Sequence, residues 1–250
     1  MHASTFPLHS PQTGTEYRIQ VLVPQAGEAG AEGAVSVMLF LDGDDQFRFA
    51  VEAYRAARAA GEVPALLLAG VGYGASYTKL GNKRVRDYTP TAVATESESG
   101  GAEAFVTFLE ATLWPELARR HRVREDLRGI GGHSLGSLLV LHALFRKEPF
   151  FHRFLASAPS IWWDDRSVLG TVARRQQEGG DLNARVFLSV GAKDSHSMTG
   201  DLALLEKQLA DKPLAELEVV SRRFSGRDHF NVLPDAFRAG LSALWRDGAK

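Results

Sequence analysis

Hydrophobic and polar residues alternate along the chain in two kinds of segment. Short, nearly uninterrupted apolar runs are separated by longer stretches in which apolar residues recur every three or four positions. The first kind is typical of strands buried on both faces of a sheet, and the second of amphipathic helices that cover such faces. Their alternation predicts an α/β protein with a mostly parallel central sheet flanked by helices.

These patterns define the elements that we expect. Strands are predicted at residues 17–23, 35–41, 65–71, 127–132, 154–157, 185–190 and 217–220. Helices are predicted at residues 47–60, 102–120, 134–145, 166–177, 200–210 and 230–245. Pro115 should bend or restart its helix, because proline has no N–H to donate. The apolar face of the last helix is predicted from Phe230, Leu233, Phe237, Leu241 and Leu244.

Other segments interrupt the alternation. Residues 25–33 are rich in Gly, Ala and Glu and predict a surface turn. Residues 42–45 (DGDD) predict a turn-forming loop at the carboxyl end of the strand 35–41. Residues 72–101 have little periodicity, and a loop of this length inside a domain is usually functional or mobile. We expect one domain, residues 1–250, with 72–101 as a loop near the active site.

The composition excludes several classes of protein. The 250 residues are 44% hydrophobic and 24% charged, as in a globular enzyme, and a net charge of −1 gives no attraction for nucleic acid or an anionic membrane. The absence of cysteine excludes disulfides, thiolate metal sites and a cysteine nucleophile. Residues 1–11 do not have the pattern of a signal peptide, so we expect a cytoplasmic location. The oligomeric state stays open.

The strongest chemical motif is residues 132–136 (GHSLG), between a predicted strand and a predicted helix. This setting is that of a nucleophile elbow, in which a serine occupies a tight turn that the flanking glycines permit. Ser134 is therefore the candidate nucleophile of an α/β-hydrolase fold. A tight turn without chemistry is the alternative.

A serine nucleophile needs a base within hydrogen-bond reach. His229 lies in a polar loop between the last predicted strand and the last predicted helix, where this fold carries its base. For the other histidines, surface or packing roles are expected, and for His2 and His9 no fixed geometry. The acid should follow a strand between Ser134 and His229, which favours Asp194 over its rivals Asp201 and Asp228. A Ser–His dyad stays open.

The expected oxyanion hole combines two backbone donors. One is the N–H of Leu135, and the other is the N–H of Gly43 or Asp44, in the loop after the strand 35–41. A plain polar turn is the alternative for that loop. This chemistry uses neither a metal nor a cofactor, and its partner is a small-molecule ester.

Four stretches resemble the esterase family that includes enterochelin-type siderophore esterases, S-formylglutathione hydrolases and mycolyltransferases. They are residues 41–44 (LDGD), 84–90 (RVRDYTP), 132–136 (GHSLG) and 157–163 (SAPSIWW). The similarity extends in outline over residues 5–245 and is nearest to the siderophore esterase branch. The absence of cysteine departs from the S-formylglutathione hydrolase branch.

The resemblance implies cleavage of carboxylic esters without a cofactor. It implies that Arg84 lies near the acyl site and supports the oxyanion or an anionic substrate, the alternative being a loop arginine paired with Asp87. It also suggests that Trp162 and Trp163 are walls of a groove for an aromatic group, with packing over the core as the alternative. An acyltransferase, a thioesterase and a non-catalytic binding protein on the same scaffold are the competing functions.

Overall fold

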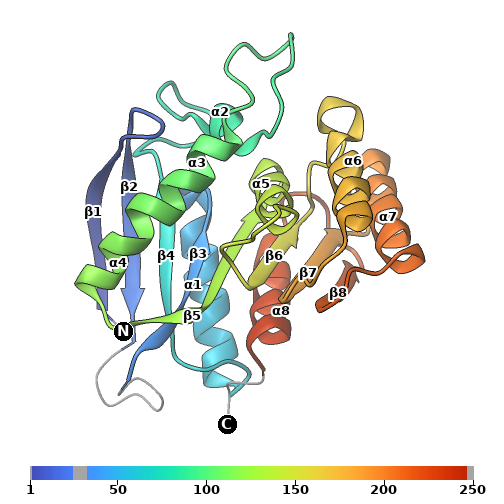
Figure 1. Cartoon of the computed structure of the whole chain (residues 1–250). Coiled ribbons are helices and arrows are strands. Elements are labelled where there is room, and N and C mark those ends of the chain that lie inside the picture. The colour runs from blue at the N-terminus through green and yellow to red at the C-terminus, as the bar shows by residue number, and fades with distance from the viewer. Residues whose placement is uncertain (1, 25–32, 247–250) are drawn as a thin grey trace.

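The computed structural model describes residues 2–24 and 33–246, whose strands form one eight-stranded sheet in the order β1-β2-β4-β3-β5-β6-β7-β8 (Figure 1). The strands are β1 (His2–Ser10), β2 (Thr15–Val23), β3 (Val35–Phe40), β4 (Leu66–Gly72), β5 (Val123–His133), β6 (Arg153–Ser157), β7 (Ala184–Gly191) and β8 (Leu217–Phe224). β1 and β2 run antiparallel to their neighbours, and every pairing from β4 to β8 is parallel. The predicted α/β class and the mostly parallel sheet are confirmed.

Helices cover both faces of this sheet (Figure 1). α1 (Gly43–Ala59) and α8 (Leu233–Trp245) lie on one face. The other face carries α3 (Ala102–Phe108), a π-helical turn η1 (Leu109–Leu113), α4 (Trp114–Arg120), α5 (Leu135–Leu144), α6 (Trp163–Glu178) and α7 (His196–Asp211). A short helix, α2 (Arg84–Tyr88), lies in the segment between β4 and α3. Each face therefore has its own helical layer.

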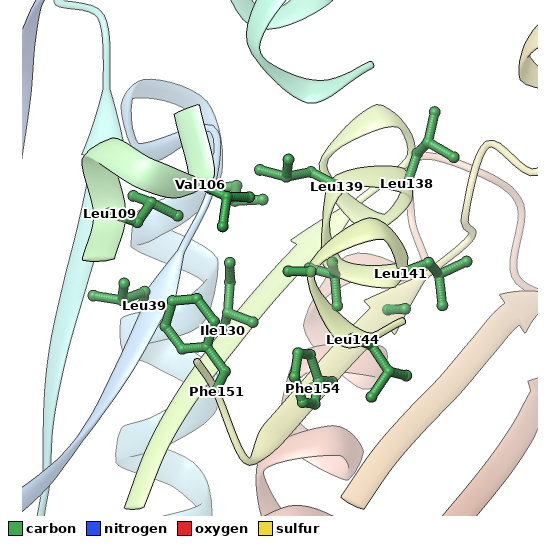
Figure 2. Close-up of a cluster of buried hydrophobic side chains, with 14 of the residues drawn as sticks. Leu39, Val106, Leu109, Ile130, Leu138, Leu139, Leu141, Leu144, Phe151 and Phe154 are labelled. Carbon is green, nitrogen blue, oxygen red and sulfur yellow. The ribbon is translucent and has the colours of Figure 1, made fainter. Parts of the chain in front are cut away.

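The two layers bury two apolar clusters, one on each face of the sheet. All six residues of β3 are buried, and successive side chains point to opposite faces: Val37 and Leu39 join the larger cluster, whereas Met38 and Phe40 join the smaller one. Figure 2 shows part of the larger cluster, where leucines of α5 face Ile130 of β5. Burial on both faces explains why the strand patterns were uninterrupted apolar runs.

The helix predicted at 102–120 contains the interruption expected at Pro115. The chain stays helical but widens into the π-helical turn Leu109–Leu113 directly before α4, which has Pro115 in its first turn. A proline there removes one N–H from the helical hydrogen-bond pattern, and the wide turn accommodates that loss.

Several boundaries differ from the prediction. The N-terminus is not free of fixed geometry, because β1 pairs along its whole length with β2. Residues 43–45 are not loop, since α1 begins at Gly43 and directly follows Asp42, whose backbone is left-handed at φ 52°. α8 begins at Leu233, so Phe230 is not part of its apolar face and is 80% exposed. The turn predicted at 25–33 falls almost wholly on residues 25–32, outside the described residues.

The topology brings distant loops to one edge of the sheet. β3, β5, β6, β7 and β8 are parallel, so the loops that follow them leave at the same edge. The register aligns the ends of β5 and β6, where His133 is opposite Ser157, and Ser157 is opposite Ser189 of β7. Within residues 2–24 and 33–246, no helix combines the length and apolarity needed to cross a membrane.

Candidate active site

Ser134 occupies a strained turn between β5 and α5. Its φ of 59° and ψ of −122° lie in a region that residues with a Cβ rarely adopt. A Cβ on Gly132 would lie 2.6 Å from the backbone carbon of Gly136, so the turn can form only with glycine at position 132. α5 begins at the next residue, Leu135, and directs the N–H groups of its first turn toward this site. The glycine spacing thus reflects a close approach of two backbone segments.

Hydrogen bonds from the loop after β6 hold this turn from the outside. The N–H of Ser134 donates to the carbonyl oxygen of Ser157 at 3.0 Å, and the N–H of Ser160 donates to the carbonyl oxygen of Ser134 at 3.2 Å. From inside α5, the hydroxyl of Ser137 donates to the carbonyl oxygens of Gly132 and Ser157 at 2.7 and 2.8 Å. The strained backbone is therefore fixed on both sides of the serine.

His229 and Asp194 meet across two neighbouring loops. Nδ1 of His229 lies 2.8 Å from Oδ2 of Asp194, whose side chain is 3% exposed. The loops approach so closely that a Cβ on Gly191 would lie 2.4 Å from the carbonyl oxygen of Arg227. The carbonyl of Arg227 also accepts the N–H of Lys193 at 2.8 Å. A backbone contact thus sets the distance between the acid and the imidazole.

The two rival acids have other partners. Asp201 is buried in α7 and accepts a hydrogen bond from Arg166 at 2.7 Å. Asp228 is partly exposed, and its carboxylate accepts the backbone N–H groups of Phe230 and Asn231, both at 2.9 Å. Of the three carboxylates considered from the sequence, Asp194 is the one that the fold brings to His229.

Ser134 and His229 line the same cavity, which has a volume of about 400 Å³. Oγ of Ser134 lies 3.3 Å from Oγ of Ser160, and among the described residues no hydrogen bond joins Ser134 to His229. The other walls include two arginines and three aromatic residues: Arg48, Arg84, Phe49, Tyr77 and Phe230. A larger hollow of about 810 Å³ lies between β8 and α8, but it contains none of the candidate catalytic residues, so its size does not make it the active site.

His133 separates the cavity from the core. Its ring centroid lies 4.6 Å from that of His229, and its Nδ1 is 3.2 Å from Oγ of Ser157. Burial lowers the pKa of His133 well below the ordinary value, and the neighbouring His229 and Arg84 lower it further. His133 is therefore neutral near pH 7 and places no cation beside His229.

Arg84 points into the cavity, but its partner is not the one considered from the sequence. Its Nε and Nη2 donate to the two carboxylate oxygens of Asp42 at 2.7 and 2.9 Å. Burial alone would lower the pKa of Arg84, but the charge of Asp42 and the hydrogen bonds to it outweigh burial and raise that pKa. Asp87, the expected alternative partner, instead accepts bonds from Tyr17, Tyr73 and Arg86. The arginine is thus held rigidly at the cavity wall.

Gly43 and Asp44 form the first turn of α1, beside the elbow. A Cβ on Gly43 would lie 2.9 Å from the backbone of Val71, so this turn packs directly on the end of β4. The carboxylate of Asp44 accepts the N–H groups of Tyr73 and Gly74 at 2.5 and 3.0 Å and so holds the loop after β4. Because these are first-turn residues, their own N–H groups have no acceptor within the helix.

The two tryptophans do not line the cavity. Trp163 is 4% exposed, packs in the larger apolar cluster and donates its Nε1–H to Thr91 at 3.2 Å, so packing is its role. Trp162 is 45% exposed and contacts the ring of Trp163.

Sequence reasoning missed residues that line the cavity. Arg48 and Phe49 fall in the helix predicted at 47–60, to which no site role was given. The helix in fact begins at Gly43, and both residues line the cavity. Tyr77 lies in a segment without periodicity, and Phe230 fitted the spacing of the helix predicted at 230–245 although it precedes α8 and lines the cavity. Ser160 lies within residues 157–163, where the two tryptophans were the candidates for the site and the serine was not. Within residues 2–24 and 33–246, no three His, Cys, Asp or Glu side chains form a group that could hold a metal.

Comparison with known proteins assigns this architecture to a family. Residues 10–231 match the family model described as "Putative esterase". The chain is 29% identical, over 94% of its length and 90% of the relative, to siderophore triacetylfusarinine C esterase of Aspergillus fumigatus. It is 30% identical to ferri-bacillibactin esterase BesA of Bacillus subtilis, over 85% of this chain and 80% of that protein. The crystal structure of the BES protein from Bacillus cereus superposes with a TM-score of 0.86 at 26% identity, covering 97% and 94% of the two chains.

The fold and these relatives define a carboxylic-ester hydrolase with the α/β-hydrolase architecture. The chain belongs to the esterase family that the matching model describes. The resemblance to the siderophore esterase branch, inferred from four short stretches, is confirmed.

Proposed function

We propose that the protein hydrolyses siderophore esters through an acyl intermediate on Ser134, with His229 as the base and Asp194 as the acid. The observation that carries this proposal is the 2.8 Å bond between His229 and Asp194, beside a cavity that Ser134 also lines. A buried carboxylate on Nδ1 fixes the imidazole as the tautomer whose Nε2 is free to accept a proton. That nitrogen can then serve a serine in the same cavity.

Acylation begins when Oγ of Ser134 attacks the ester carbonyl carbon and its proton passes to Nε2 of His229. Rotation about the Cα–Cβ bond of Ser134 brings Oγ toward His229 when substrate binds. The negative oxygen of the tetrahedral intermediate is stabilised by the N–H of Leu135 and by that of Gly43 or Asp44, with Arg84 close by. Collapse of the intermediate expels the alcohol, which takes the proton from His229.

Deacylation repeats these steps with water. His229 removes a proton from a water molecule, whose oxygen attacks the acyl carbon. The bond to Oγ of Ser134 then breaks, and the serine recovers its proton from His229 as the acid leaves. The cycle consumes one water for each ester bond and needs no cofactor.

The walls of the cavity suit ester substrates that carry aromatic groups. Phe49, Tyr77 and Phe230 offer aromatic surface. Arg48 offers a positive charge, but Asp45 also lines the cavity and Arg84 is already paired with Asp42. The relatives are named for siderophore esters, triacetylfusarinine C in one case and ferri-bacillibactin in the other. These two kinds of observation together support a siderophore ester as the substrate.

The nucleophile is tested with a fluorophosphonate probe and a p-nitrophenyl ester. We expect the probe to label the wild-type protein on the peptide that contains Ser134, and Ser134→Ala to lose labelling and at least about 10⁴-fold in turnover. Mass spectrometry of the labelled peptide identifies the site. Label on another serine, or full turnover by Ser134→Ala, would refute the assignment.

The substrate is tested by chromatography of products from iron-loaded and iron-free siderophores of the trilactone and fusarinine types. We expect cleavage to linear and monomeric acids, abolished in Ser134→Ala. Turnover of simple esters with no cleavage of any siderophore would refute the substrate class and leave the nucleophile standing. A cytoplasmic location is part of the proposal, and cell fractionation tests it.

A further inference from the structure

Ser160 contacts the reacting atom of the proposed nucleophile from the side of the loop that follows β6. Its Oγ lies 3.3 Å from Oγ of Ser134, and its N–H donates to the carbonyl oxygen of the same residue at 3.2 Å. The two residues are 26 positions apart in the chain, so the contact depends on the parallel pairing of β5 and β6. Backbone and side chain of Ser160 therefore both hold Ser134.

The position of Ser160 is fixed by its surroundings. The residue has no exposed surface, and its carbonyl oxygen accepts the N–H of Trp163 at 3.2 Å. The loop reaches this position through a left-handed residue, Ala158 at φ 44°, followed by Pro159. Left-handed backbone at a residue with a Cβ persists only where the surrounding structure imposes it. The position of Ser160 is therefore determined by the surrounding protein and not by solvent.

Burial limits what the Ser160 hydroxyl can do. Within the described part of the chain, its hydrogen bond is to Oγ of Ser134. A buried hydroxyl that loses its partner has no water to replace it, so the Ser160 hydroxyl follows Oγ of Ser134 as that atom turns toward His229. When Ser134 gives its proton to His229, its oxygen becomes an acceptor only, and Ser160 must then be the donor. A hydrogen bond to a charged oxygen is about twice as strong as one between neutral groups.

We propose that Ser160 is a further catalytic residue, whose hydroxyl donates to Oγ of Ser134 while the Ser134 proton moves to His229. This role rests on the proposed function of Ser134. Ser160 keeps its own proton throughout and forms no covalent bond. It lowers the energy of the attacking oxygen in acylation and of the leaving oxygen in deacylation. The segment 157–163 thus contributes to the site through a serine, and not through its tryptophans.

The first test compares Ser160→Ala with wild type in the rate of fluorophosphonate labelling and in kcat/KM for a p-nitrophenyl ester. We expect both to fall about 10- to 100-fold. Ser160→Thr, which keeps the hydroxyl, should recover part of the loss. The matched control is Ser137→Ala, since Ser137 is equally buried but donates to the carbonyl oxygens of Gly132 and Ser157 and not to Oγ of Ser134. It should lower the melting temperature more than Ser160→Ala does and slow labelling less.

Two results of this test would overturn the proposal. One is labelling of Ser160→Ala at or above the wild-type rate, which would mean that Ser160 accepts the Ser134 proton and holds it away from His229. The other is an equal loss in Ser160→Ala and Ser160→Thr, which would mean that the residue acts through packing alone.

The second test measures donation directly and does not depend on hydrolysis. The chain contains no cysteine, so the ultraviolet absorbance of a thiolate in Ser134→Cys comes from that position alone. If Ser160 donates to this atom, it stabilises the thiolate. Adding Ser160→Ala should then raise the pH midpoint of thiolate formation by about one unit. An unchanged or lower midpoint would overturn the role of Ser160, whereas a different labelled serine would overturn the proposed function instead.

Discussion

The two sides of Ser134 are built from different interactions. On one side, two single hydrogen bonds connect side chains: Ser160, on the loop after β6, bonds to Ser134, and His229, on the loop after β8, bonds to Asp194 on the loop after β7. On the other side, Asp42 and Asp87 have fully buried side chains that are paired with arginines and tyrosines. We call the first the reactive side and the second the anchoring side.

The difference follows from what each side must do with protons. In the proposed reaction, Ser134 and His229 exchange a proton, so the bonds that Ser160 and Asp194 make to them must hold in more than one protonation state. Groups of the anchoring side keep their charges: the pairing with Asp42 raises the pKa of Arg84 in spite of burial. Because breaking a buried pair leaves an uncompensated charge, the anchoring side should determine stability and the reactive side should determine rate.

The largest expected effect is on the reactive side. Asp194→Asn should lower kcat about 10⁴-fold, because the amide favours the wrong tautomer of His229, while the melting temperature changes little. The matched control is Asp228→Asn, one residue before the base, whose carboxylate bonds to backbone N–H groups and not to the imidazole. Steady-state kinetics on a p-nitrophenyl ester measures both. Near wild-type turnover in Asp194→Asn would indicate a Ser–His dyad.

The next largest effect is on the anchoring side, where a substitution should reduce stability more than it reduces the reaction rate. Asp42→Asn leaves Arg84 charged in a site where its side chain is 14% exposed, and should lower the free energy of unfolding by about 3 kcal/mol. Urea unfolding measures the loss. Combining it with Arg84→Met should cost less than the sum of the two single changes.

The control for this pair is an exposed one. Asp126→Asn breaks the pair with Arg124, in which both side chains are about half exposed or more, and should leave the free energy of unfolding almost unchanged because solvent screens the pair. An equal loss of unfolding free energy in Asp42→Asn and Asp126→Asn would mean that the buried pair is no more important for stability than an exposed one, and that the anchoring side has no special role.

A smaller effect is expected at the second carboxylate of the anchoring side. Tyr73→Phe removes a 3.0 Å hydrogen bond to buried Asp87 and should cost about 1.5 kcal/mol of unfolding free energy. Tyr17 donates to the same oxygen at 2.7 Å, so Tyr17→Phe should cost at least as much. Thermal unfolding compares the two. If neither change lowered stability, Asp87 would not be an anchor.

The smallest effect is a pH dependence at His133, where the two sides meet. Its pKa in the folded protein is well below 6.5, so between these values the unfolded chain binds a proton that the folded chain does not. Stability should therefore be complete above pH 6.5 and fall below it, by about 1.4 kcal/mol per pH unit for this group. In His133→Asn that component should be absent.

Other histidines have to be separated from this effect. Burial also lowers the pKa of His121, His142 and His152, which contribute to the slope in both proteins. The difference between wild type and variant isolates His133. Urea unfolding at several pH values gives the unfolding free energy of each protein as a function of pH. Parallel curves for wild type and His133→Asn would contradict the prediction.

The sequence was sufficient where a structural requirement acts on neighbouring residues and so produces a recognisable sequence pattern. Strands buried on both faces must be almost wholly apolar, as in β3 and β4. A turn in which backbone segments approach closely needs glycine, which made residues 132–136 recognisable. The acid and the base follow strand ends in chain order, so Asp194 and His229 were selected as a pair that the structure brings within 2.8 Å.

The sequence was insufficient where interacting side chains are far apart in the chain and only the fold brings them together. Asp87 is three positions from Arg84 and was its expected alternative partner, yet Asp42, 42 positions away, holds the arginine. Asp87 is unavailable because two tyrosines and Arg86 occupy it. β1 was not predicted because this edge strand has exposed residues at alternate positions and therefore no apolar run. It is a strand because it pairs with β2 along its whole length.

The position of His229 in the sequence, after all eight strands of the sheet, has a consequence for synthesis. α8 completes the smaller apolar layer by packing on the sheet and α1, for example through rings of Phe40 and Phe237 that are 5.1 Å apart. Proteins fold from the N-terminus while they are being made, so that layer stays uncovered until the last helix leaves the ribosome. The proposed base, His229, is positioned in the same interval. If His229 is the base, a nascent chain can form its sheet and still be inactive until α8 has been made.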